Sequence, residues 1–469
     1  MDRKRKPGFR IISVFLSIVI MLTGCGETAA TEEVQTDYKL SMEETPYLEY
    51  LVPRMEPGVL VDLRGYSAAG NKKIIMRGEE LPGEFRVVDA DTGQVVYTGE
   101  VKQKGYHDDR EEYNSYGTFS EFLQEGEYYI ECDRIGRSHN FLIQADLYEQ
   151  VLQEALGELV IIPVTVSEDG SASLSTEEQA SWMLQIIILL LSYELYPDVF
   201  ADDNEDQIPD IMEILAVMIK ELSNLQDTKT GSAGELNYTY AAALAKFSYL
   251  YQKYDNVYAT EILNLADKAW RYAEGIRKNQ TGTDEASGNG DEAYRMLAAA
   301  ELYRAAGQSK YGNVITQYQG SSASVSGNEL PIEENKMEET LAKMTYISTK
   351  RKVNLSLCSQ FMRELMLEAE ETAARAGNSL YLSASDVDND GMDKLIWDII
   401  QLSVVEYVIY NNEYGQVIDN QYHYLMGVNP DAYCYFSSGI TGEAGIRIQD
   451  NPVWLAGFVM VLSVIITKN

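Results

Sequence analysis

Three aspartates in the sequence DVDNDG, residues 386–391, have the spacing of calcium ligands. Asp386, Asp388 and Asp390 occupy the first, third and fifth positions of such a loop. The twelfth position, which normally supplies a bidentate glutamate, is Trp397. We therefore favour an acidic loop at the start of a helix and keep a calcium site as the alternative.

A second acidic cluster, DDNED at residues 202–206, is a weaker calcium candidate. Asp202, Asp203 and Asp206 supply its carboxylates. Clustered charges between helical patterns are typical of a solvated turn, so a turn is again the preferred interpretation.

Soft metal ligands are few and scattered in this chain. The cysteines and histidines are Cys25, Cys132, Cys358, Cys434, His107, His139 and His423. No C-x-x-C spacing occurs, and an odd number of cysteines follows Cys25, so neither a zinc site nor a disulfide framework is predicted. We expect no cofactor and no transition metal.

The N-terminus has the order of a secretory signal. A basic stretch, MDRKRKPGFR, is followed by the apolar run IISVFLSIVIML and then by Thr23, Gly24 and Cys25. LTGC resembles the bacterial lipobox, whose cysteine receives a lipid. The sequence therefore predicts a signal peptide over residues 1–24, lipid attachment at Cys25 and an extracytoplasmic protein anchored to a bacterial membrane.

The formal net charge is −35. Residues 1–24 carry five basic groups and one acidic group, so removing them gives −35 − 4 = −39. Such acidity excludes nucleic acid and anionic head groups as natural partners. A neutral polymer such as polysaccharide is compatible with it.

The elements that must position any active groups fall into two patterns. Residues 25–48 are acidic and nearly free of aromatics, which predicts a flexible tether. Residues 49–145 contain short β-rich runs, with a hairpin turn at Asp91 and Gly93, and predict a β-sandwich.

After residue 146 the apolar spacing becomes helical. Trp182, Ile186, Leu189 and Tyr193 follow one another at intervals of four, three and four. Similar patterns begin at Ile262 and Leu395, and strand signals nearly vanish. Residues 146–469 therefore predict an all-α domain of helical hairpins, and an α/α toroid fits this better than a four-helix bundle.

The last apolar segment, VWLAGFVMVLSVII, covers residues 453–466. As a helix it spans about 21 Å, which is short of the roughly 30 Å core of a bilayer. We expect a buried final helix rather than a membrane anchor.

The two-domain order resembles glycoside hydrolase family 9, the endoglucanase group with an N-terminal immunoglobulin-like module. The matching stretches are GTFSEFLQEGEYYIE (117–131), SHNFLI (138–143), LLLSYELYPDVF (189–200), DDNEDQIPDIMEI (202–214), DEAYRMLAAAELYRAAGQSKY (291–311) and LMGVNPDAYCYF (425–436). The resemblance implies an immunoglobulin-like sandwich followed by an (α/α)6 toroid, and inverting hydrolysis of β-glucan.

Inversion requires a carboxylate base and a carboxylic acid about 6.5 to 9.5 Å apart, with a water between them. By resemblance, the family's two water-handling aspartates fall in SEDGSASLSTEEQ, residues 167–179. Asp169 matches the first aspartate, but Ala172 stands where the second, the base, belongs. Glu177 and Glu178 could substitute only in a rebuilt loop, and we interpret them as helix-start residues instead.

The family's acid matches Glu443, one residue out of register, in a loop much shorter than the family's. An exposed acidic turn is an equal interpretation of Glu443. The family's sugar-binding histidine is missing, because no histidine follows His423.

Three hypotheses follow. The protein is an active cell-surface glycosidase with Glu443 as acid and Asp169 as the remnant of the aspartate pair. Alternatively, it is a degenerate member that binds carbohydrate without efficient cleavage, which we favour. The third is a structural or interaction lipoprotein.

Overall fold

The computed structural model describes residues 57–80, 82–108, 111–159, 161, 174–224, 234–280, 291–318, 336–436 and 445–468. These residues belong to one compact unit. The predicted signal peptide, Cys25 and the predicted tether lie outside the described residues, as do Asp169 and Glu443.

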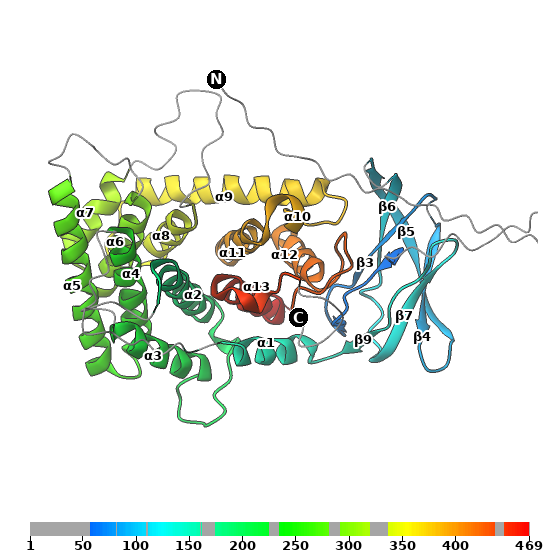
Figure 1. Cartoon of the computed structure of the whole chain (residues 1–469), viewed down its shortest axis with the longest axis horizontal. Coiled ribbons are helices and arrows are strands. Elements are labelled where there is room, and N and C mark those ends of the chain that lie inside the picture. The colour runs from blue at the N-terminus through cyan, green and yellow to red at the C-terminus, as the bar shows by residue number, and fades with distance from the viewer. Residues whose placement is uncertain are drawn as a thin grey trace, which may run out of the picture. The chain divides into compact units, whose positions relative to one another are not determined.

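A strand-rich domain comes first, as predicted (Figure 1). Its strands are β1 (Val59–Leu60), β2 (Tyr66–Ser67), β3 (Lys73–Gly78), β4 (Glu84–Asp89), β5 (Val95–His107), β6 (Glu112–Thr118), β7 (Gly126–Cys132), β8 (Gly136–Arg137) and β9 (Phe141–Gln144). The expected hairpin joins β4 to β5, where Gly93 has φ +67°. The apolar pattern did not predict β6, because its glycine and polar residues obscure the alternation of a strand.

The β-domain is a curled sheet, whereas two separate sheets were expected. The strand order is β1-β3-β6-β5-β4-β7-β9-β2, with β8 on β7. The first half of β5 pairs with β4 and its second half with β6, with a register shift near Gly105. Bulges bend and twist a strand, so one long strand can serve both halves. Phe85 fills the concave side, where its ring leaves no room for a Cβ at Gly99 or Gly117.

The rest of the chain is mostly helical. The helices are α1 (Leu147–Gly157), α2 (Thr176–Leu195), α3 (Asp210–Ser223), α4 (Gly234–Tyr251), α5 (Asn256–Gln280), α6 (Glu292–Ala306), α7 (Ser309–Gln317), α8 (Lys336–Ser348), α9 (Leu355–Asn378), α10 (Val387–Asp390), α11 (Met392–Ile409), α12 (Asn412–Leu425) and α13 (Pro452–Lys468), with short 3-10 turns at Pro197–Val199 and Ile448–Asp450.

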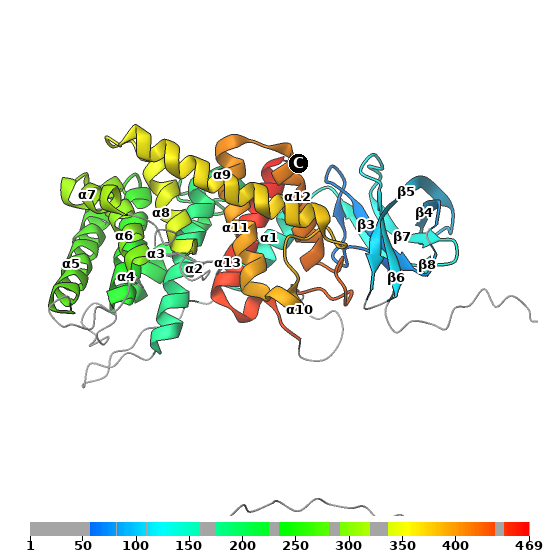
Figure 2. The ribbon, with the colours of Figure 1, turned by 90° about the horizontal axis from the view of Figure 1, so that it is seen from above.

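Contacts among the described helices arrange them in an inner ring and an outer layer. The inner order is α2, α4, α6, α8, α11 and α13, and α13 packs against α2 to close the ring. Outer helices fill the spaces behind, and α9 lies alongside α8, α11 and α12 (Figure 2). This arrangement is consistent with an (α/α)6 toroid.

The predicted helical faces are mostly buried. Trp182, Ile186 and Leu189 of α2 are fully buried, whereas Leu265 and Ile409 are half-buried and Tyr272 of α5 is 56% exposed. Helix α5 is an outer helix, so the end of its apolar stripe faces water instead of a neighbour. The final helix, α13, is buried from Leu455 to Ile465, which confirms that expectation. Among the described helices, none has the length and apolarity to cross a bilayer.

Candidate active site

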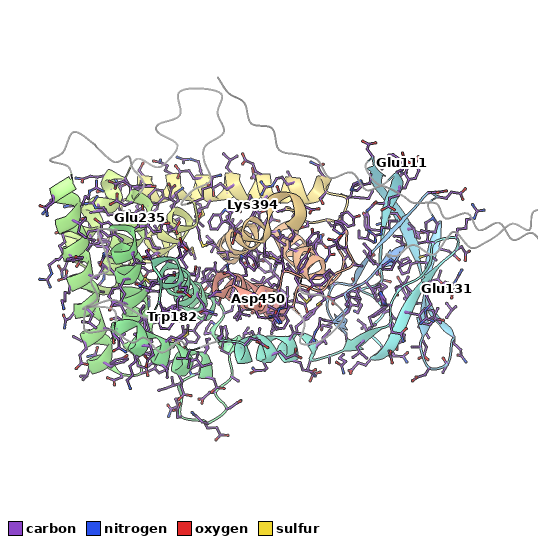
Figure 3. The ribbon with its side chains drawn as sticks, viewed as in Figure 1. Glu111, Glu131, Trp182, Glu235, Lys394 and Asp450 are labelled. Carbon is purple, nitrogen blue, oxygen red and sulfur yellow. The ribbon has the colours of Figure 1, made fainter. Side chains whose placement is uncertain are left out.

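Helices α11 and α13 run in the same direction, as contacts at both of their ends show. At their starts, Trp454 Nε1 donates to Asp393 Oδ1 at 2.6 Å. At their ends, Lys468 Nζ lies 2.7 Å from Glu406 Oε1. Figure 3 labels Lys394, beside Asp393 on α11, and Asp450, just before α13.

The ends of α2, α4, α6 and α8 also meet, through one buried group of charges. Glu194 accepts from Lys246 Nζ at 2.6 Å and from Arg304. Glu301 accepts from Arg304 Nη2 at 2.5 Å and from Thr345 Oγ1 at 2.8 Å. Because each of these residues lies near the C-terminus of its helix, these four helices are parallel as well. We call Glu194, Lys246, Glu301 and Arg304 the charge cluster.

An aromatic contact relates the pair α11 and α13 to the group α2, α4, α6 and α8. Tyr196, directly after α2, packs edge-on against Tyr407 near the end of α11, with ring centroids 5.6 Å apart. The starts of all six inner helices therefore lie at the end of the ring opposite the charge cluster. The segments that carry Asp169 and Glu443 lead into α2 and α13, two neighbours at that end.

The start of α2 is a complete capping box. Glu178 N donates to Ser175 Oγ at 3.2 Å, and Ser175 N donates to Glu178 Oε2 at 2.7 Å. The second bond lowers the pKa of Glu178. Glu177 is exposed. The interpretation of both glutamates as helix-start residues is confirmed.

The turn before the Glu443 segment is held rigidly by Asn429. Its Nδ2 donates to Tyr433 O at 2.6 Å, and its Oδ1 accepts from Tyr433 N at 3.0 Å. Beyond the turn, Ile448 N donates to Tyr435 O at 2.9 Å. The residues on either side of the Glu443 segment are therefore bonded to each other at its base.

Glu338, in the first turn of α8, is the unusual carboxyl at this end. Its side chain is 4% exposed, and burial raises its pKa to about 7, with smaller contributions from Glu339 and Glu235. Figure 3 labels Glu235 at the start of α4. A carboxyl half-protonated near neutral pH can donate a proton, which is the property a general acid needs. Sequence reasoning missed Glu338 because glutamate is ordinary in a first turn and only burial distinguishes it.

Two other carboxylates near the starts of the inner helices are paired with cations. Glu339 Oε2 lies 3.6 Å from Lys343 Nζ. Glu274 accepts from Arg295 Nε at 2.6 Å and from Tyr238 Oη at 2.8 Å. Burial alone would raise the pKa of Glu274, but these bonds outweigh it and lower the pKa. Glu274 therefore stays ionised to a lower pH than an ordinary glutamate, unlike Glu338.

Both ring nitrogens of His423 are hydrogen-bonded to the β-domain. Its Nδ1 lies 2.8 Å from Asp62 Oδ2 and its Nε2 lies 2.9 Å from Asn71 O, both in the β-domain. The other two histidines, His107 and His139, also belong to the β-domain. With both ring nitrogens bonded and the side chain buried, His423 cannot bind a sugar hydroxyl.

The two acidic loops behave as turns. Asp390 Oδ2 accepts from Asp386 N at 2.9 Å at the start of α10, while the side chain of Asp388 is not described. Asp202 Oδ2 accepts from Gln207 N at 2.8 Å. Within the described ranges, no three histidine, cysteine or acidic side chains form a group able to hold a metal ion.

The tyrosines at the junction of α4 and α5 do not line the candidate end. Tyr251 stacks on Phe247 at 4.6 Å, and Tyr254 Oη lies 2.5 Å from Tyr193 Oη. Tyr249, Tyr251, Tyr254 and Tyr258 are all half-buried. They lie where α4 ends, beside the charge cluster.

Comparison with solved structures finds the same fold. The chain is similar to a metagenome-derived glycoside hydrolase family 9 endoglucanase, with a TM-score of 0.69 and 17% identity over 86% of this chain and 98% of that one. It is also similar to a single mutant of a thermostable endoglucanase from Alicyclobacillus acidocaldarius, with a TM-score of 0.67 and 14% identity over 87% and 99%. A GH9 protein of Bacteroides ovatus gives 0.65 and 14% over 87% and 98%.

No curated protein matches the chain. Two family profiles do. The cellulase N-terminal ig-like domain matches residues 54–137, and glycosyl hydrolase family 9 matches residues 170–448. Since the second match covers more than half of the sequence, the chain belongs to glycosyl hydrolase family 9 and carries an N-terminal immunoglobulin-like domain.

Proposed function

We propose that the protein is a lipid-anchored, extracytoplasmic member of family 9 that binds β-glucan chains without cleaving them efficiently. The anchor is Cys25, and the glycan-binding region is the end of an (α/α)6 toroid at which the inner helices start. General acid-base groups contribute about 10² to 10⁴-fold each, so an inverting site without its base turns over slowly.

One sequence feature carries this proposal. By resemblance, Ala172 falls at the position of the family's second aspartate, and an alanine cannot accept a proton. Of the two carboxylates at the start of α2, Glu177 is exposed and Glu178 is engaged with Ser175 in the capping box. Asp169 alone would hold a water without completing the pair.

The proposal is tested by restoring the base. The purified protein and its Ala172→Asp variant are assayed for release of reducing ends from soluble β-glucan, and for retardation in gels containing the same glucan. We expect the wild type to be retarded with little turnover, and Ala172→Asp to release reducing ends at least about 10²-fold faster.

Two further variants serve as controls. Adding Glu443→Gln to Ala172→Asp should abolish the gain, whereas adding Glu178→Gln should leave it intact. Turnover by the wild type that disappears in Glu443→Gln contradicts the proposal. An absence of glucan retardation contradicts it as well.

An active endoglucanase is the second candidate, and family membership favours it. Glu338 is the specific observation in its support, because a carboxyl with a pKa of about 7 at the correct end of the ring is suited to proton donation. If this candidate is right, the wild type cleaves β-glucan and Glu338→Gln lowers kcat, with little change in KM.

A further inference from the structure

A buried aspartate and histidine join the β-domain to the helical domain. Asp62 follows β1 and is fully buried, and His423 lies in the last turn of α12 and is 2% exposed. Their side chains meet at 2.8 Å, between Asp62 Oδ2 and His423 Nδ1. Tyr66 and Tyr422 pack on the imidazole, with ring centroids 5.1 and 5.5 Å away.

Both nitrogens of His423 face groups that accept hydrogen bonds. Nε2 meets the carbonyl oxygen of Asn71 at 2.9 Å, which has no proton to offer, so Nε2 must donate. Nδ1 meets Asp62 Oδ2, and a hydrogen bond there needs a second proton, carried either by the ring or by the carboxyl. Without that proton, two lone pairs face each other in a buried site.

The surroundings of Asp62 favour keeping the proton. Its Oδ1 already accepts from Arg64 N at 2.8 Å and from Gly65 N at 3.1 Å. Burial raises the pKa of Asp62, while His423 and these amides oppose the rise. A cation in the last turn of a helix is also favoured by the helix dipole.

Other titratable groups face the pair from each element packed around it. They are Tyr66 on β2, Tyr148 on α1, Asp419 and Tyr422 on α12, Cys434 in the following turn, Lys468 at the end of α13, Lys73 on β3, and Arg64 with its partner Glu154 on α1. Burial raises the pKa of each of these tyrosines, of Cys434 and of Asp419. None of the tyrosines ionises in the range in which a histidine ordinarily titrates.

The bonded pair sits beside the turn that leads towards Glu443. Leu63 N donates to Met426 O at 2.8 Å, and Arg77 Nη1 donates to Pro430 O at 2.5 Å. We propose that Asp62 and His423 share a proton that fastens the β-domain to the end of α12, and that losing this proton above neutral pH loosens the turn over residues 426–436.

The direction of the pH effect follows from proton counts. In the unfolded chain the histidine loses its proton near pH 6.5 while the aspartate is already ionised. The folded pair keeps the shared proton to a higher pH, so the native state binds more protons than the unfolded state in this range. Stability from the pair is therefore present below about pH 6.5 and is lost as the pH rises.

The test compares thermal unfolding from pH 6 to pH 10 in wild type, Asp62→Asn and an Asp91→Asn control in an exposed hairpin turn. The side-chain amide introduced by Asp62→Asn can donate to neutral His423 and needs no shared proton. We expect Asp62→Asn to fold, and its Tm to fall less than half as much as that of the wild type between pH 6 and pH 9. Asp91→Asn should follow the wild type.

A second measurement detects the proton shared by Asp62 and His423 in the wild type, so it does not depend on whether Asp62→Asn folds. In the proton NMR spectrum of ¹⁵N-labelled wild type, a strongly deshielded proton between His423 Nδ1 and Asp62 Oδ2 should be seen at pH 6 and should disappear as the pH is raised to 10. The inference is overturned if this proton is absent at pH 6 or persists unchanged to pH 10. A parallel loss of Tm by wild type and Asp62→Asn at every pH overturns it too. Neither readout depends on glycan binding or turnover, so failure here is distinct from failure of the proposed function.

Discussion

At the scale of single residues, similar glutamates in first helical turns have different fates. Glu178 is exposed and closes a capping box, whereas Glu339 is bonded to Tyr318 and lies near Lys343. Glu338 precedes Glu339 on α8, and its burial raises its pKa. The same residue type near a helix start is therefore a cap, an ion-pair partner or a weak acid, according to what surrounds it.

Glu338→Gln should stabilise the protein at alkaline pH. The pKa of Glu338 is raised from 4.5 to about 7 in the folded state. Between these values the carboxyl ionises in the unfolded chain but stays protonated in the folded one, so the free energy of unfolding falls as the pH rises. Relative to wild type, the variant should gain about 3 kcal/mol in the free energy of unfolding between pH 5 and pH 8. Urea unfolding at the two pH values measures this gain. An equal difference at both would show that Glu338 is ionised when folded.

At the scale of elements, polar contacts between neighbouring inner helices hold their C-terminal ends together. The charge cluster joins the ends of α2, α4 and α6 with two anions and two cations. Arg304 also lies over the ring of Tyr249, 4.4 Å from its centroid. Buried charges persist only when paired, so these contacts fix which helices are neighbours.

Glu194→Gln should destabilise the ring strongly at neutral pH. Burial alone would raise the pKa of Glu194, but Lys246 and Arg304 outweigh it and lower the pKa to about 2. The stability that ionised Glu194 provides is present above pH 4.5 and is lost as the pH falls towards 2. We expect a loss of about 3 kcal/mol at pH 7 and roughly half of that at pH 3, where folded Glu194 is still mostly ionised.

Denaturant unfolding at pH 7 and pH 3 checks this, with Glu149→Gln, at an exposed position on α1, as the control. The control should match the wild type at both pH values. A loss for Glu194→Gln that is the same at pH 3 and pH 7 would indicate a packing defect rather than the removal of a charge.

At the scale of the whole compact unit, the β-domain supports the turn next to the candidate site. Arg77 of β3 is buried and donates to Pro57 O at 3.1 Å and to Pro430 O at 2.5 Å. Gly427 has φ +129°, and a Cβ there would lie 2.7 Å from Leu63. The turn over residues 426–436 is thus shaped by the β-domain as well as by Asn429.

Arg77→Met should loosen this turn. It removes a donor from Pro430 O within a buried interface, and the loss of such a bond costs about 1 to 3 kcal/mol. Hydrogen exchange followed by mass spectrometry should show faster exchange than in the wild type over residues 426–436 and unchanged exchange over α4 and α6. Arg86→Met, which breaks a partly exposed ion pair with Glu131, is the control and should leave exchange in the turn unchanged. Unchanged exchange in Arg77→Met would mean that the helical domain holds the turn without help.

The sequence by itself determined the order of a strand-rich and a helical domain, because alternating and helical apolar spacings are local properties. It also set two chemical limits: Ala172 cannot be a base in any fold, and no histidine follows His423. It predicted that Glu177 and Glu178 begin a helix, since the residues that start and cap a helix are close together in the sequence.

Only the tertiary structure decided which groups face each other. The curl of the sheet depends on β5 pairing with β4 along one half and with β6 along the other. The glycine and polar residues of the strand at Glu112–Thr118 hid that strand from local patterns. The charge cluster and the bond between Asp62 and His423 join residues up to hundreds of positions apart. The burial of Glu338 likewise depends on the fold. Desolvation acts on side chains by their neighbours in space, so no local spacing could distinguish these carboxyls from ordinary surface acids.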